Sequence, residues 1–455
     1  MHLLIELRYG RNICYKKNFI VKNNEKIVLL GKNLIQMKKY IFIIAFLAFQ
    51  MSFGQITDGN EKVDFQDRFK NAKKTFTNFE GSDYRFKIIK HLDATPIKNQ
   101  NRTGTCWSFS GLSFLESELL RKGKPAFNLS EMWIARNAYI GKAQNYLLMD
   151  GHLNFGEGGE FHDIPWVVKR YGIVPQYAYQ GNNYGGDRHN HSELKAVLTA
   201  MLKALKDKPQ NHKLTKSWKK AYTNVVDAYL GDVPENTEDF QFTYDNKTFT
   251  PKSFAKYIDL NMDDYVELTS FTHHPYYKAY AMELPDNWQM HTAYNIPLDE
   301  LMKISENAIN KGYTFAWGAD VSEKGFSHRK GLAILPADPR SVQDKRSNSK
   351  TFDKNGEAIP NAFFTPVKEK DVSPEERQTA YENGETTDDH GMHIVGIVKD
   401  QTGKKYFIVK NSWGNSNELN GYFFVSFPYF KYKTIDIFVH KDALPKDLKK
   451  KLNIK

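Results

Sequence analysis

Apolar residues recur at three- and four-residue spacings between Trp107 and Leu119, a pattern that predicts a largely buried helix. Gly123 and Pro125 follow and end this helix, because neither residue continues one readily. The segment before Trp107 is rich in Pro, Asn and Gly and predicts a loop. Cys106 is therefore expected at the N-terminal end of a buried helix.

Short runs of β-branched and aromatic residues dominate the C-terminal region. They cover residues 390–398, 406–411 and 421–425 and are separated by Gly, Asn and Asp, which predicts an antiparallel sheet or barrel. His390 would begin one strand and Asn411 would end its neighbour. A hairpin brings such positions together, because the ends of its two strands pair.

The long stretch between these regions contains amphipathic segments at Leu194–Leu205 and Leu298–Lys311, which predict helices. Helices and strands are thus segregated along the chain, which favours an α+β fold. At 455 residues, with 40% hydrophobic and 26% charged residues, the chain has the composition of a folded globular protein.

A targeting pattern precedes the predicted fold. Lys38 and Lys39 are followed by an apolar run, Tyr40–Phe49, and by small residues before a cut near Gly54-Gln55, as in a secretory signal peptide. The run falls short of the ~20 residues that span a bilayer, so an uncleaved anchor is the weaker alternative and no stable membrane span is expected. We therefore expect a secreted or periplasmic protein.

Met37 begins this pattern, which assigns residues 37–54 to the signal peptide. Residues 1–36 are then interpreted as an upstream extension, the alternative being a real basic leader. Residues 55–83 form a short N-terminal segment, and residues 446–455 a Lys-rich C-terminal tail.

The formal net charge of +11 does not predict a nucleic-acid surface. Residues 1–54 carry nine Lys/Arg and two Asp/Glu, so the remainder has 55 basic against 51 acidic residues. A net charge of +4 on the rest is typical of an ordinary solvated surface, and a nucleic-acid partner is unlikely on this basis.

Two cysteines occur, Cys14 and Cys106, and cleavage of the leader would leave one thiol. A lone thiol is more often a buried passenger than a nucleophile, but the position of Cys106 reverses that preference. The unpaired N–H groups and the dipole of a helix N-terminus favour a thiolate, and an adjacent imidazolium would favour it further. Attack on a carbonyl needs an oxyanion hole, to which the Cys106 N–H and the side chain of Gln100 are assigned.

His390 is the predicted general base, and Asn411 the residue that holds its ring in one tautomer. Trp413 could shield that contact from water. His393 is the rival base, but in a strand it points to the opposite face from His390. The remaining histidines match no zinc motif, so neither a metal site nor a cofactor is predicted.

These residues resemble the papain-like cysteine peptidases, and within them the bleomycin hydrolase and aminopeptidase C branch, over roughly residues 84–445. The resemblance rests on five motifs in family order, namely Gln100 with Cys106-Trp107-Ser108-Phe109-Ser110, Leu129-Ser130-Glu131, Gly156-Glu157-Gly158-Gly159, His390-Gly391-Met392, and Asn411-Ser412-Trp413-Gly414.

The resemblance implies a two-lobe fold, with a helical left lobe carrying Cys106 and an antiparallel β-barrel-like right lobe carrying His390 and Asn411. It also implies a large, mainly helical insertion at about residues 181–315. Gly158, Gly159 and Trp107 are expected to bind an extended peptide substrate in the cleft between the lobes, and a homo-oligomer is compatible with the branch.

The resemblance also implies a peptidase that forms a thioester, and it leaves two alternatives open. In the branch, the extreme C-terminus lies in the cleft and makes the enzyme an aminopeptidase. The Lys-rich tail here is expected to be too short for that, so endopeptidase activity stays open. The other alternative is a catalytically silent papain-like binding module.

Overall fold

The computed structural model describes residues 75–207, 213–343 and 351–455. All described residues belong to one compact unit, Asp58–Lys455, the second of two along the chain. The predicted extension 1–36, the predicted signal peptide 37–54 and the first part of segment 55–83 lie outside the described residues. Within the described ranges, no helix combines the length and apolar character needed to cross a bilayer.

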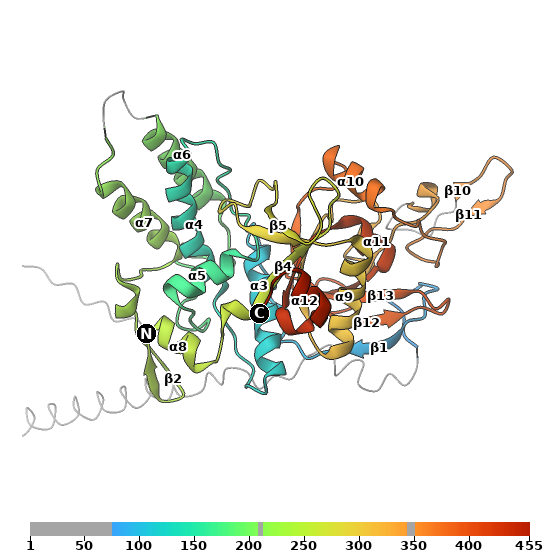
Figure 1. The fold of residues 1–455 in the computed structure, drawn as a ribbon, viewed down its shortest axis with the longest axis horizontal. Coiled ribbons are helices and arrows are strands. Elements are labelled where there is room, and N and C mark those ends of the chain that lie inside the picture. Colours follow the sequence, from blue (N-terminus) through green and yellow to red (C-terminus); the bar gives the residue numbers. More distant parts are fainter. Residues whose placement is uncertain (1–74, 208–212, 344–350) are drawn as a thin grey trace, which may run out of the picture. The chain divides into compact units, whose positions relative to one another are not determined.

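Helices make up one side of the second unit (Figure 1). They are α3 (Cys106–Arg121), α4 (Glu131–Leu148), α5 (Asp163–Tyr171), α6 (Ser192–Lys206), α7 (Ser217–Leu230) and α8 (Pro251–Tyr257). Ser130 starts α4 as its motif predicts, because its side chain accepts a hydrogen bond from the Trp133 N–H. Helix α3 packs against both α4 and the large sheet, so it joins the two halves of the fold.

The other side is one large sheet. Its hydrogen-bonded order is β5 (Lys278–Ala281), β6 (Thr292–Asn295), β4 (Tyr265–Thr269), β15 (Thr434–His440), β7 (Phe315–Ala319), β12 (His390–Lys399), β13 (Lys405–Lys410), β14 (Tyr422–Ser426), β9 (Leu332–Ala333) and β8 (Phe326–Ser327), with β1 (Lys87–His91) beside β12. Most pairs are antiparallel, but β4 with β6 and β14 with β9 are parallel. The predicted α+β architecture is confirmed, and the sheet is mixed rather than wholly antiparallel.

Smaller elements complete the described chain. The helices α9 (Leu298–Lys311) and α11 (Phe427–Lys433) pack on the sheet, whereas α10 (Pro374–Glu382) contacts α11. The remaining elements are the hairpins β2 (Phe242–Tyr244) with β3 (Lys247–Phe249) and β10 (Thr351–Phe352) with β11 (Ala358–Ile359), the short helix α12 (Lys446–Lys451), and the 3₁₀ turns Thr237–Asp239, Met262–Asp264, Pro339–Ser341 and Lys441–Ala443.

Residues 181–315 contain the two helices expected from their amphipathic pattern, α6 and α9. They also contribute β4, β5 and β6 to the large sheet, which the prediction of a mainly helical insertion omitted. These strands are only four or five residues long, and that length gives too few positions to reveal a period of two.

The Lys-rich segment 446–455 is a docked helix rather than a free tail. Leu448 and Leu452 lie four residues apart on one face of α12 and are buried in the core that also holds Leu301 and Ile304 of α9. None of these last ten residues lines the cleft around Cys106. As far as the sequence extends, its C-terminal residues therefore pack away from the cleft.

Candidate active site

Cys106 is the first residue of α3, as predicted, and its thiol is half-buried. Two hydrogen bonds hold the loop that leads to it. The Gln100 N–H donates to the Ser412 carbonyl at 2.9 Å, and the Gly104 N–H donates to the Glu157 carboxylate at 2.6 Å. The loop is thereby attached to both the sheet and the glycine-rich turn, which fixes where the sulfur lies.

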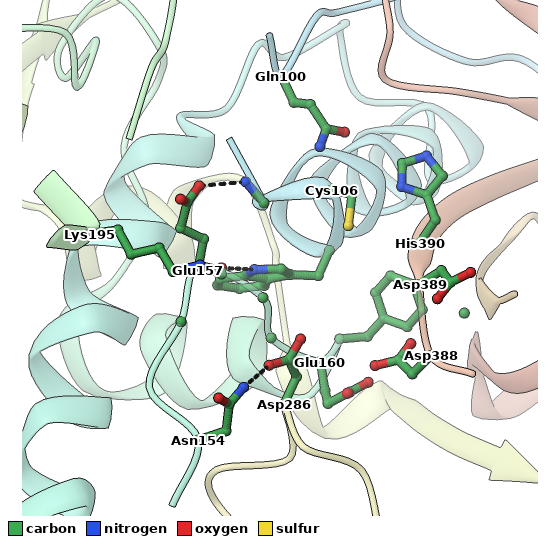
Figure 2. Close-up of a pocket in the computed structure, with 18 of the residues that line it drawn as sticks. Gln100, Cys106, Asn154, Glu157, Glu160, Lys195, Asp286, Asp388, Asp389 and His390 are labelled. Atoms are coloured by element: carbon green, nitrogen blue, oxygen red, sulfur yellow. Dashed lines mark hydrogen bonds between the residues drawn. The ribbon is translucent and has the colours of Figure 1, made fainter. Parts of the chain in front are cut away.

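His390 begins β12 beside this thiol, and Figure 2 shows its imidazole next to the Cys106 sulfur. The backbone of Gly391 lies near the sulfur and acts to lower the pKa of the thiol. A Cβ at Gly391 would lie 2.9 Å from the Ser110 Oγ and 3.1 Å from the Trp107 Cα. Only glycine lets the strand approach the helix this closely, so Gly391 brings His390 to the thiol.

Asn411 follows β13 and contacts the far side of the imidazole. Its Oδ1 lies 2.7 Å from the His390 Nε2, while its Nδ2 lies 3.2 Å from the Nδ1 of His328. In this amide orientation Oδ1 accepts the Nε2–H, which leaves the Nδ1 of His390 as the basic nitrogen. Trp413 stacks on the imidazole with ring centroids 4.7 Å apart and an interplanar angle of 27°.

Gln100 is buried and lines the same cleft. Its Oε1 accepts from the Ser412 Oγ at 2.6 Å, and its Nε2 donates to the Thr103 carbonyl at 2.8 Å. An amide nitrogen carries two hydrogens, so one N–H is left over. Figure 2 shows this nitrogen on the side of the amide that faces Cys106.

The glycine turn forms the opposite wall. A Cβ at Gly158 would lie 1.8 Å from the Asp286 carboxylate, and one at Gly159 would lie 2.9 Å from the Trp107 ring. The Trp107 Nε1–H donates to the Glu157 carbonyl at 3.1 Å, and its side chain is 1% exposed. Both glycines are therefore required by close packing, and Trp107 supports the wall from behind.

Burial decides the protonation of the nucleophile and base. It raises the pKa of the Cys106 thiol to about 12, although the N–H groups of Gly391 and Trp107 act in the opposite direction. Burial also lowers the pKa of His390 to about 4, against the effect of Asn411. Desolvation therefore opposes both the thiolate and the imidazolium, whereas the helix N-terminus favours the thiolate.

The rival base lies elsewhere. His393 is fully buried, with its Nδ1 3.0 Å from the Ser113 Oγ, which in turn accepts from the Lys410 ammonium at 2.6 Å. It does not line the cleft. Of the two histidines in β12, only His390 reaches the side where Cys106 lies.

The cleft has a volume of about 520 Å³ and is strongly acidic. Its charged lining residues are Glu157, Glu160, Lys195, Asp286, Asp388 and Asp389. Behind it lie further carboxylates, and the ligand atoms of Glu160, Glu267 and Asp436 are all within 4.8 Å of one another. Burial raises the pKa of Glu267 to about 7 and also raises the pKa of Asp436 well above its usual range, so both carboxyl groups bind a proton more readily than exposed ones do.

Two other groups have metal-ligand types close together. They are His162 with Glu267 and His291, and His273 with His274 and Glu283. The His162 Nδ1 lies 2.9 Å from Glu267, and burial lowers the pKa of both His162 and His291 to about 4. Neither group touches the thiol, and neither His162 nor His291 lines the cleft.

Comparison with known proteins gives the same assignment. The sequence matches the Peptidase C1-like family over residues 142–337 and 369–455, which is more than half of the chain. The chain belongs to this family. The matched ranges contain His390 and Asn411 but begin after Cys106, so the nucleophile is identified from the geometry of the cleft.

Several curated relatives are similar over most of their length. Aminopeptidase G of Lactobacillus delbrueckii subsp. lactis is 25% identical, over 78% of this chain and 83% of the relative. Aminopeptidase C of Listeria monocytogenes is 24% identical over 85% and 90%, and mouse bleomycin hydrolase is 22% identical over 81% and 85%. The predicted branch of papain-like cysteine peptidases is confirmed.

A solved structure shares the fold. The crystal structure of pepw from Lactobacillus rhamnosis superimposes with a TM-score of 0.61 at 19% identity, and the match covers 86% of this chain and 90% of that one. The chain is thus a cysteine peptidase with a papain-like fold, and the alternative of a silent binding module gains no support.

Proposed function

We propose that the protein hydrolyses peptide bonds with Cys106 as nucleophile, His390 as base and Asn411 as the residue that orients the base. One observation carries this proposal. The close approach of Gly391 to the start of the helix places His390 beside the Cys106 thiol, and the far nitrogen of its imidazole lies 2.7 Å from the Asn411 oxygen.

Catalysis starts from the neutral pair. The thiol proton moves to the Nδ1 of His390 as the sulfur attacks the substrate carbonyl carbon, and each new charge stabilises the other in the buried site. The oxyanion receives hydrogen bonds from the Cys106 N–H and the free N–H of Gln100. His390 then protonates the leaving amine as the C–N bond breaks, which leaves a thioester on Cys106.

Hydrolysis of the thioester reverses these roles. Water attacks the thioester carbon while His390 accepts its proton. The C–S bond then breaks, the sulfur takes the proton back from His390, and the carboxylic acid product is released. Trp413, stacked on the imidazole, keeps water from the His390–Asn411 hydrogen bond in both steps. Gly158, Gly159 and Trp107 form the wall along which the peptide lies.

We further propose that the enzyme is an aminopeptidase. Support comes from the names of the relatives, which include aminopeptidases G and C over most of their length. Residues 446–455 pack outside the cleft, so this segment does not line the place where the substrate amino terminus would bind. Export of the chain is also part of the proposal, and the pattern from Lys38 to Gly54 supports it.

The decisive test replaces the nucleophile. We expect Cys106→Ala to lower kcat by about 10⁴ or more, because removal of a nucleophile leaves only binding and the oxyanion hole. Turnover of peptide coumarylamides gives the rate, and mass spectrometry shows whether a peptidyl epoxide labels residue 106. Met149→Ala, at an exposed position that does not line the cleft, is the control, and it should keep full activity and labelling. Normal hydrolysis by Cys106→Ala would refute the assignment.

A further inference from the structure

The acidic residues of the cleft differ in what their carboxylates already bind. Glu157 accepts from the Gly104 N–H. Asp389 accepts from the Ser322 N–H at 3.0 Å and from the Thr387 hydroxyl at 2.7 Å. These two carboxylates accept backbone N–H groups and so hold loops in place, which the described residues do not show for the other acidic side chains of the cleft. Three acidic side chains are left, those of Glu160, Asp286 and Asp388.

Glu160 directly follows the glycine turn and is 4% exposed, yet it lines the cleft. Its side chain interacts with that of Asp388, but its Oε1 has no hydrogen-bond partner among the described residues. Figure 2 shows Glu160 and Asp388 pointing toward each other below Cys106. A buried carboxylate oxygen without a donor is costly, and a cationic ligand would remove that cost.

Asp286 reaches the cleft from the segment between β5 and β6. Its Oδ2 lies against Gly158, where a Cβ would be 1.8 Å away, and its Oδ1 accepts from the Asn154 amide at 2.9 Å. The carboxylate thus lies on the wall along which the substrate backbone is expected to lie. Three segments distant in sequence therefore bring acidic groups to one side of the cleft.

The protein supplies little positive charge to this side. Lys142 lies behind the glycine turn, where its ammonium donates to the carbonyls of Gly156 and Gly158. Lys195 lines the cleft but is exposed. Among the described residues, no lysine, arginine or histidine forms a salt bridge with the three acidic residues. Their negative charge is also felt at the reaction centre, because Asp388 and Asp286 both raise the pKa of the Cys106 thiol.

We propose that Glu160, Asp286 and Asp388 bind a primary ammonium group of the substrate and so place the neighbouring carbonyl at Cys106. Carboxylates recognise an ammonium through short, charge-assisted hydrogen bonds, and those bonds are strongest in a partly desolvated site. A free amino terminus and a lysine side chain both carry this group. The inference rests on the proposed peptidase function and gives it a specificity determinant within the cleft, which residues 446–455 do not supply.

Three substrates separate the two sources of the ammonium. They are leucine coumarylamide with a free amino terminus, acetyl-leucine coumarylamide, and acetyl-lysyl-leucine coumarylamide. The wild-type enzyme should prefer an ammonium-bearing substrate over the acetylated neutral one by at least ~10-fold in kcat/KM. Preference for the first identifies the amino terminus as the ligand, and preference for the third identifies the lysine side chain.

The variants Glu160→Gln, Asp286→Asn and Asp388→Asn test the residues. Each should lower kcat/KM for the preferred substrate by about 10- to 100-fold, mainly through KM, because one charge-assisted hydrogen bond is lost. Hydrolysis of acetyl-leucine coumarylamide should stay within about threefold of wild type, since that substrate has no ammonium to bind. Glu283→Gln is the matched control, because Glu283 precedes Asp286 in the same segment but does not line the cleft.

Two results would overturn the inference. One is a wild-type enzyme that cleaves the acetylated neutral substrate as fast as both ammonium-bearing ones. The other is a set of variants that lose activity on all three substrates in equal proportion, which would indicate a structural role. Failure of the proposed function looks different, because then Cys106→Ala would cleave every substrate as well as the wild type does.

Discussion

The two sides of the cleft differ in whether their polar side chains are hydrogen-bonded within the protein. Around the thiol, both ends of the Gln100 amide and both ends of the Asn411 amide are hydrogen-bonded to the protein. On the acidic side, the Oε1 of the buried Glu160 has no donor. The first side is fixed before substrate arrives, as preorganised catalysis requires. The second side has unmet hydrogen-bonding capacity, as a binding site for a cation requires.

The largest expected loss of activity comes from a change on the side of the cleft that surrounds the thiol. Gln100→Ala should lower kcat by about 10²–10³ with little change in KM, because the lost N–H would stabilise only the oxyanion. Steady-state kinetics on the preferred coumarylamide measure this. Gln401→Ala, at an exposed turn distant in sequence, is the control and should leave kcat unchanged. A Gln100→Ala variant with normal kcat would show that the second oxyanion donor is another group.

The two sides also differ in how far sequence alone could predict them. Short sequence motifs contain the four residues of the reaction centre, Gln100, Cys106, His390 and Asn411. Each motif lies beside a helix or strand whose hydrophobic periodicity is visible in the sequence. The hairpin of β12 and β13 then makes the proximity of His390 and Asn411 a local consequence. The α+β fold and the two amphipathic helices were predictable for the same reason.

The acidic side depends on tertiary packing. Asp286 carries no motif, and it reaches Gly158 only because residues 181–315 add strands to the large sheet. His328 lies on a loop after β8 and contacts Asn411 from 83 residues away. The sequence shows the helix N-terminus that favours a thiolate at Cys106, but it does not show the burial that raises the pKa of this thiol.

The two sides of the cleft should also respond differently to pH. Burial raises the pKa of Asp388 to about 7 and raises that of Glu160 as well, whereas it lowers the pKa of His390 to about 4. The carboxylates that face Asp388 are those of Glu160, Asp286, Asp389 and Asp436. As the pH falls from 8 to 5, Asp388 therefore gains a proton and loses its negative charge, while His390 remains neutral.

The expected result is a change in binding alone. The KM of an ammonium-bearing substrate should rise about 10-fold as the pH falls from 8 to 5, because one carboxylate loses its charge. The kcat/KM of acetyl-leucine coumarylamide should stay nearly constant over the same range. Asp388→Asn should have a flatter KM profile than the wild type, since the titrating group is gone. Equal pH profiles for both substrates would contradict the division of the cleft into two sides.

The smallest expected loss of activity comes from a change at His328, which orients the Asn411 amide beside the thiol. The Nδ1 of His328 lies 3.2 Å from the Asn411 Nδ2, and its ring packs edge-on against Trp413 with centroids 5.0 Å apart. His328→Phe would keep the ring contact but remove the hydrogen bond that fixes the orientation of the Asn411 amide. The Asn411 oxygen would then face His390 for only part of the time.

We therefore expect His328→Phe to lower kcat by about 2- to 10-fold and to leave KM unchanged, because one neutral hydrogen bond contributes about 1 kcal/mol. His328→Gln can again offer an acceptor to Asn411, so it should recover part of the lost rate. If both variants lost the same rate, His328 would act through packing against Trp413 alone. A rise in KM specific to ammonium-bearing substrates would instead place His328 with the acidic side, contrary to its contacts with Asn411 and Ser416.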